Sequence, residues 1–158
     1  MTWGDPPKLK SDPPKQGKKI TPEMLATGSE DGEQAALFCW AADHVSKYPQ
    51  LEWLFAIPNG GSRHIAEATK MVAGGVRKGV PDILLPWPMA FTTNIKDCYA
   101  GCFIELKIEK RRKEKNGGCS QNQLEWIKQL KLNGYYVAVC YGWTEARDVL
   151  IAYLEGKL

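Results

Sequence analysis

Three charged residues on two short apolar segments could together bind a divalent cation. Asp82 directly precedes one apolar run, and Glu105 and Lys107 lie within a second run, residues 101–107. Both runs are short and bounded by Gly or Pro, which indicates buried β-strands rather than helices. Side chains alternate along a strand, so Glu105 and Lys107 should project to one face of the sheet. If the two strands pair, Asp82 would lie near the same edge.

Two carboxylates and an ammonium at one point suit phosphoryl chemistry. Mg²⁺ takes oxygen ligands and keeps several waters, so two carboxylates are enough to hold it against a substrate phosphate. The lysine could then orient an attacking water or neutralise charge that develops on the phosphate. Without a metal ion the carboxylates would repel each other, and at least one would resist ionising.

The order of these residues resembles the PD…ExK signature of restriction-endonuclease-like phosphodiesterases. More narrowly, five segments resemble the virus-type replication-repair nuclease (VRR-NUC) domain, from about residue 29 to the C-terminus. They are Glu33-Gln34, Ala56-Ile57-Pro58-Asn59-Gly60-Gly61, Gly75-Val76-Arg77-Lys78-Gly79-Val80-Pro81-Asp82, Ile104-Glu105-Leu106-Lys107 and Ser120-Gln121-Asn122-Gln123. The resemblance implies an α/β, restriction-endonuclease-like fold, a small mixed β-sheet flanked by α-helices.

The resemblance also assigns roles around the acidic pair. It implies that Asp82, Glu105 and the backbone carbonyl of Leu106 hold Mg²⁺ or Mn²⁺, with Glu33 and Gln123 assisting from flanking helices. Alternatives exist for both helical residues. An acidic residue in a first turn also suits the helix dipole, which would explain Glu33. Gln123 could instead complete a capping box, so the two roles compete for one side chain.

Several polar and basic residues near these motifs are candidate DNA contacts. Some lie in a Pro/Gly turn and the helix after it, some in the Gly-rich loop before Asp82, and some in the basic run after Lys107. They are Asn59, Arg63, Arg77, Lys78, Arg111, Arg112 and Lys113. Arginine grips phosphate in a bidentate way, and clustered cations favour contact with the DNA backbone. The alternatives are ordinary turn chemistry, a flexible connector and a solvated hairpin tip.

Helices and strands predicted from local sequence patterns must position these candidate site residues. Residues 1–28 are rich in Pro and Lys and poor in apolar residues, which indicates a flexible tail, either a DNA-contacting arm or a solubilising segment. Residues 29–158 form the expected nuclease-like domain. Apolar periodicity predicts helices over residues 29–47, 62–73, 120–133 and 143–154, and strands over residues 51–57, 80–85, 101–107 and 135–140.

Composition narrows the class of protein. The 158 residues carry a net charge of +3, which permits binding to a polyanion without requiring it. The five cysteines show no CxxC pair, and with two histidines no zinc spacing is recognisable. No signal peptide or membrane-spanning run is visible. We therefore expect reduced thiols and a cytoplasmic location, in a bacterial or phage-infected cell, without membrane association.

Two functions from different classes remain open. The first is a Mg²⁺- or Mn²⁺-dependent DNA endonuclease, which the resemblance extends to branched DNA, in the manner of Holliday-junction resolvases in replication and repair. The resemblance also implies a homodimer, for which the apolar segment at residues 86–91 is a candidate surface unless that segment packs on its own domain. The alternative is a non-catalytic nucleic-acid-binding module that keeps the fold.

Overall fold

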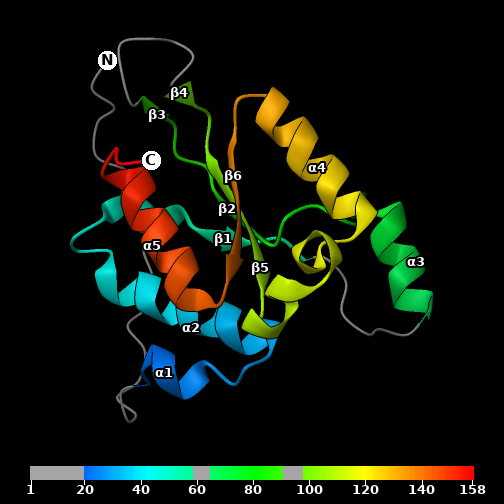
Figure 1. The fold of residues 1–158 in the computed structure, drawn as a ribbon, viewed down its shortest axis with the longest axis horizontal. Helices are drawn as coiled ribbons and strands as arrows, with labels where there is room; N and C mark the ends of the chain where they lie inside the picture. The colour runs from blue at the N-terminus through cyan, green and yellow to red at the C-terminus, as the bar shows by residue number, and fades with distance from the viewer. Residues whose placement is uncertain (1–19, 59–64, 91–97) are drawn as a thin grey trace.

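A four-stranded mixed β-sheet forms the centre of the protein (Figure 1). The structure is a computed structural model that describes residues 20–58, 65–90 and 98–158. The strands are β1 (Phe55–Ala56), β2 (Ile83–Leu85), β5 (Cys102–Lys107) and β6 (Tyr136–Tyr141), in the order β1-β2-β5-β6. β2 is antiparallel to β1 and β5, while β6 is parallel to β5. This mixed pairing confirms the expected α/β class.

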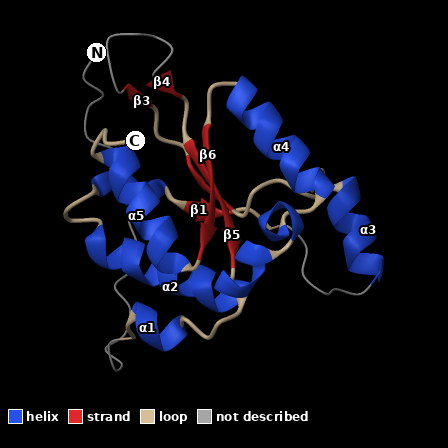
Figure 2. Ribbon diagram, in the orientation of Figure 1, coloured by secondary structure: helices blue, strands red, loops and turns tan. Residues whose placement is uncertain are grey.

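Helices cover the sheet on both sides (Figure 2). α2 (Glu30–His44) and α5 (Trp143–Leu154) pack together on one side, whereas α4 (Gln121–Leu132) lies on the other, as does α3 (Ile65–Ala73) in this view. The main core lies between the sheet and the α2–α5 layer. It includes Leu37, Ile83, Ile104, Leu106, Leu150 and Tyr153, all at most 1% exposed.

β5 is buried on both faces, and this explains its near-continuous apolar sequence. Ile104 and Leu106 point into the core under α2 and α5. By alternation, Glu105 and Lys107 face the other way, toward α4. Both are buried, at 0% and 3% exposure. The expected placement of these two charges on one face is therefore confirmed.

The expected strand over residues 51–57 is wrong in its first half. Pro49–Trp53 forms a 3-10 helix, and the strand itself spans Phe55–Ala56. Leu51 and Leu54 are both buried, and their spacing of three residues is that of a tight helical turn. The apolar run therefore packs its side chains by turn spacing, with Pro49 opening the helix, rather than by strand alternation.

Residues 86–90 pack on their own domain. Met89–Ala90 (β3) pairs with Cys98–Tyr99 (β4) in a separate two-stranded sheet, and Trp87 and Met89 lie against the core. The Tyr153 hydroxyl donates a hydrogen bond of 2.7 Å to the Trp87 carbonyl. For these residues the structure supports intradomain packing over an exposed partner surface; Phe91 lies outside the described residues.

A short helix precedes the expected domain. α1 (Pro22–Leu25) lies against α2, and Leu25 and Ala26 pack against the core. The domain boundary at residue 28 stays a prediction, but the described end of the expected tail contributes to the packed structure. Across residues 20–58, 65–90 and 98–158, no helix combines the length and apolar character needed to cross a bilayer.

Candidate active site

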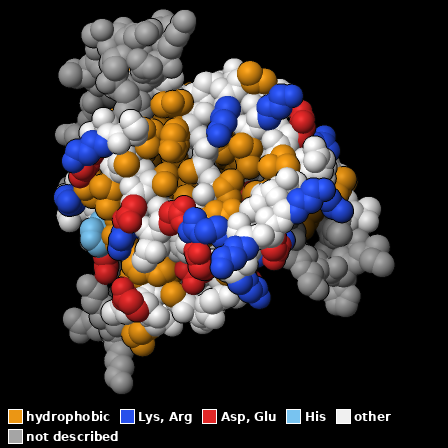
Figure 3. Space-filling view, viewed as in Figure 1, with side chains coloured by type: hydrophobic (Ala, Val, Ile, Leu, Met, Phe, Trp, Pro, Cys, Tyr) orange, Lys and Arg blue, Asp and Glu red, His pale blue; other side chains and the backbone are white. Residues whose placement is uncertain are grey.

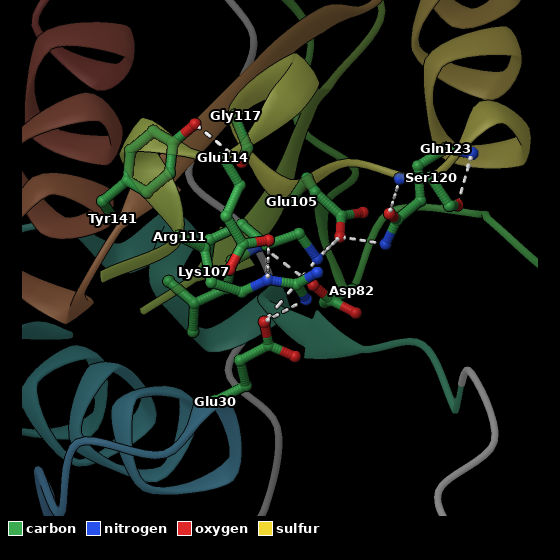
Figure 4. A network of polar contacts seen from close by, with 11 residues as sticks. Glu30, Asp82, Glu105, Lys107, Arg111, Glu114, Gly117, Ser120, Gln123 and Tyr141 are labelled. Carbon is green, nitrogen blue, oxygen red and sulfur yellow. Dashed lines mark hydrogen bonds and ion pairs between the residues drawn. The ribbon is translucent and has the colours of Figure 1, made fainter. Parts of the chain in front are cut away.

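Strand pairing brings Asp82 and Glu105 together. β2 and β5 are antiparallel with Ile83 opposite Ile104, so the next pair in register is Asp82 opposite Glu105. Asp82 Oδ2 accepts a hydrogen bond of 2.9 Å from the Leu106 backbone N–H. Asp82 directly precedes β2, which begins at Ile83. Its side-chain carboxylate thus accepts from a β5 backbone N–H that a backbone carbonyl would accept from in a continued ladder (Figure 4).

Glu105 is a buried carboxylate with one oxygen left over. Its Oε1 accepts hydrogen bonds from Lys107 Nζ, at 2.5 Å, and from Gln123 Nε2. Its Oε2 is buried without a hydrogen-bond partner in the described part of the chain. Burial, and secondly the negative charge of Asp82, raise the pKa of Glu105 to about 7. Lys107 and Gln123 therefore compensate only one oxygen of an ionised Glu105, and a cation would compensate the other.

Lys107 is the positive group of the site. Its Nζ lies 2.5 Å from Glu105 Oε1 and 3.8 Å from Glu30 Oε1. Burial lowers the pKa of Lys107, but the hydrogen bond to Glu105 and the carboxylates around it outweigh burial, so its pKa is raised overall. The side chain therefore carries its proton at neutral pH and acts as a hydrogen-bond donor and a charge.

Gln123 contacts both Ser120 and Glu105, so its side chain is engaged in the helix cap and beside the acidic pair at once. Its Oε1 accepts a hydrogen bond of 2.8 Å from the Ser120 N–H, while the Ser120 hydroxyl accepts one from the Gln123 N–H, which completes the capping box of α4. Its Nε2 donates to Glu105. An amide has an acceptor and a donor end, so the expected competition was wrong: one end caps the helix and the other holds the carboxylate.

The structure does not bring Glu33 to this group. Glu33 Oε2 accepts a hydrogen bond of 2.9 Å from the Trp143 N–H, at the first turn of α5, where a carboxylate satisfies an unpaired helix donor. Glu30 lies at the site instead, near both Lys107 and Arg111. Glu30 and Gln34 both line the cleft. Residues four apart lie on the same face of a helix, so this spacing in the sequence could have indicated that the two side chains face the cleft together.

An open cleft of about 890 Å³ runs over these residues. It is lined by Asp82, Leu106, Lys107 and Gln123, and also by Lys78. Gly79 lines the same cleft and has a φ of +91°. It lies so close to α4 that an added Cβ would be 2.7 Å from the Asn122 backbone. Only glycine fits such a close approach at that backbone angle.

The candidate DNA contacts differ in their surroundings. Arg77 and Lys78 are exposed and form no ion pair with the described residues. Arg111 pairs with Glu114 at 3.1 Å and Glu30 at 3.5 Å. Asn59 and Arg63 lie outside the described residues.

The next two residues of the basic run differ as well. Arg112 pairs with Glu109 and Glu145 at 2.8 and 2.7 Å and lies over the Tyr141 ring, whereas Lys113 is exposed and forms no ion pair with a described residue. Basic and acidic side chains accordingly lie interspersed across the middle of the face in Figure 3, without a uniform basic patch there.

The residues present fit a divalent cation. No group of three or more His, Cys, Asp or Glu side chains is placed to cage a metal among the described residues. The candidate ligands are the carboxylates of Asp82 and Glu105 and one backbone oxygen. The Lys107 carbonyl accepts a hydrogen bond from the Gly142 N–H, so by strand alternation the Leu106 carbonyl points to the opposite side, toward Asp82. Two carboxylates with bound waters suit Mg²⁺, and Glu105 Oε2, which has no partner among the described residues, is an oxygen that a cation would satisfy.

Comparisons with known proteins identify the family and support the fold. A solved structure described as a VRR_NUC domain protein aligns with a TM-score of 0.60 and 23% sequence identity, over 80% of this chain and 88% of that one, which supports the shared fold. A search of curated proteins found no match. The family model of the VRR-NUC domain, a nuclease-type domain, matches residues 29–143. The chain therefore belongs to the VRR-NUC domain family.

Proposed function

We propose that the protein is a Mg²⁺- or Mn²⁺-dependent endodeoxyribonuclease that hydrolyses phosphodiester bonds in its cleft. The observation that carries this proposal is the buried Glu105, whose pKa is raised to about 7 beside Asp82 and whose Oε2 has no partner in the described part of the chain. Such an arrangement costs folding energy and is of use where a cation binds.

In this proposal, Asp82, Glu105 and the Leu106 carbonyl hold the cation. When bound, the ion would polarise the scissile phosphate and offset the charge that develops on it. Gln123 donates from Nε2 to Glu105 Oε1, and this hydrogen bond fixes the orientation of the Glu105 carboxylate. Glu30, rather than Glu33, is the α2 carboxylate that faces Lys107, and we assign it the assisting role.

Lys107 acts as a donor in this scheme. Because its pKa is raised, Lys107 is protonated at neutral pH and cannot take a proton from water. Its ammonium is suited to orienting the attacking water through a hydrogen bond or to stabilising the phosphate as negative charge accumulates in the transition state. A charge in a site shielded from solvent is more effective than the same charge in water.

The substrate class and assembly extend the proposal. We propose a homodimer that acts on branched DNA, such as a four-way junction, during replication or repair in the cytoplasm of a bacterial or phage-infected cell. A two-fold dimer would present two active sites to a substrate with its own two-fold symmetry. Residues 29–143 match a family of replication and repair nucleases, and this supports the class of substrate.

Cleavage assays test the proposal. Labelled four-way junction, flap and linear duplex DNA would be incubated with the protein in Mg²⁺, Mn²⁺ or EDTA, beside the Lys107→Ala variant. We expect cleavage that needs the metal, is fastest on branched DNA and is lost in the variant. Tight binding without cleavage in either metal would instead show the protein to be a nucleic-acid-binding module. Sedimentation velocity would measure the oligomeric state.

A further inference from the structure

A second hollow lies beside the candidate active site. Its volume is about 370 Å³, and we call it the Trp126 pocket, after the side chains that line it: Ile57, Pro58, Val76, Arg77, Val80 and Trp126. Three of them, Ile57, Pro58 and Val80, also line the active-site cleft. The two hollows therefore adjoin each other, and a molecule bound in the cleft would lie next to the pocket.

α4 places Trp126 at a defined distance from the site. Trp126 follows Gln123 by three residues, so both side chains lie on one face of the helix, about 5 Å apart along its axis. Gln123 reaches Glu105, and Trp126 lines the neighbouring pocket. Since the capping box anchors the first turn of α4, the indole position is tied to the position of the acidic pair.

Two basic side chains lie at the pocket and beside it. Arg77 lines the pocket, Lys78 lines the adjoining cleft, and both are exposed. Neither forms an ion pair within the described ranges, in contrast to Arg112, which pairs with two carboxylates. An apolar pocket lined by an aromatic ring and a guanidinium matches a nucleotide, whose base is flat and apolar on its faces and whose phosphate is anionic.

We propose that the Trp126 pocket receives a nucleobase that has left the DNA stack next to the scissile phosphate, while Arg77 contacts the adjoining phosphate. The proposal rests on the nuclease function proposed above and explains how the cleft would select its substrate. A base without a pairing partner leaves the stack at lower cost than a paired one, so DNA with unpaired nucleotides near a branch would be favoured over intact duplex.

A thermodynamic cycle between base and indole tests this proposal. DNA affinity would be measured in the Asp82→Asn background, in which cleavage is expected to be lost, with branched DNA carrying a single abasic nucleotide at each position in turn. Without a change at Trp126, removing the base at one position near the branch should weaken binding about 5- to 100-fold. With Trp126→Ala added, the same abasic nucleotide should have little further effect.

Matched variants separate stacking from folding. The coupling is the part of the abasic effect on DNA affinity that disappears when Trp126 is replaced. Trp126→Phe keeps an aromatic face and should retain most of this coupling, and Val76→Phe should abolish it by filling the pocket. Leu132→Ala alters an apolar residue of the same helix that is 72% exposed and outside the pocket, and should leave binding unchanged. Thermal unfolding of each variant would verify that the chain folds.

The outcomes distinguish a failure of the base-pocket proposal from a failure of the proposed nuclease function. Cleavage by the unmodified protein with no coupling at any position would refute the base pocket and leave the nuclease function intact. Coupling without cleavage in any metal would refute the nuclease function and retain the pocket as a nucleic-acid-binding site. If Trp126→Ala shows no coupling but changes the oligomeric state, the pocket is an interface between two copies, and the proposal is wrong.

Discussion

The charge on Glu105 should make the metal-free protein less stable as the pH rises. Its pKa is about 7 in the folded protein against 4.5 for an ordinary glutamate, so folding takes up a proton between these values. At about 1.4 kcal/mol per unit of pKa shift, this corresponds to about 3 kcal/mol. The contribution is fully present below about pH 4.5 and is lost as the pH rises through about 7.

Glu105→Gln tests this magnitude. The amide has nearly the same shape and keeps an acceptor for Lys107 and Gln123, but it carries no charge. Between about pH 5 and about pH 8 in EDTA, the free energy of unfolding of the unmodified protein should fall by about 3 kcal/mol more than that of the variant. Urea unfolding followed by circular dichroism measures both, and groups whose pKa does not depend on Glu105 cancel in the difference.

Metal addition supplies the second half of the test. Excess Mg²⁺ should restore most of the lost stability in the unmodified protein, because it compensates the ionised pair, and should restore little in the variant. The new amide also leaves a buried donor in place of Oε2, which costs about 1–3 kcal/mol and lowers the stability of the variant at every pH. Parallel curves for the two proteins across the pH range would refute the raised pKa and with it the argument for a cation.

The remaining predictions concern the metal, the cleft wall and DNA. Because a cation requires an ionised Glu105, apparent Mn²⁺ affinity by calorimetry should fall about ten-fold per pH unit below about pH 7; a flat profile would contradict this. Asp82→Asn should abolish cleavage and weaken metal binding while DNA affinity stays equal or rises; cleavage at the normal rate would remove Asp82 from the site. Gly79→Ala should lower the free energy of unfolding by about 2 kcal/mol or more, since the new Cβ would meet the α4 backbone at a φ of +91°; an unchanged urea midpoint would show that the loop can move away. Neutralising Arg77 and Lys78 together should reduce the slope of log affinity against log salt by about 2; an unchanged slope would mean that neither cation meets a phosphate.

Local sequence patterns were sufficient where the structure depends only on residue spacing within one strand or one helix turn. β5 was expected from its apolar run, and the placement of Glu105 and Lys107 on one face follows from strand alternation. The capping box at Ser120 is equally local, since it joins residues three apart. By contrast, residues 49–53 form a 3-10 helix because Leu51 and Leu54 are buried together, and burial depends on neighbours distant in sequence.

The glutamates of α2 show where local reasoning ends. Glu30 and Glu33 both lie in the first turn of one helix, and either could be expected to face the site. Packing of α2 against α5 and β5 decides the rotation of the helix, which turns Glu33 to the Trp143 N–H and leaves Glu30 near Lys107. Arg112 is a similar case, because Glu145, one of its partners, lies 33 residues further along the chain.

The sequence by itself determined the α/β class, the order of most elements and the residue types that could bind a cation, because these depend on periodicity and chemistry within short segments. Only the tertiary structure decided that Glu105 is fully buried with one oxygen unpartnered in the described chain, that Gln123 serves the helix cap and the carboxylate at once, and that a Trp126 pocket adjoins the cleft. Burial, charge coupling and cavities arise between segments far apart in the chain, so they exist only once the strands have paired and the helices have packed.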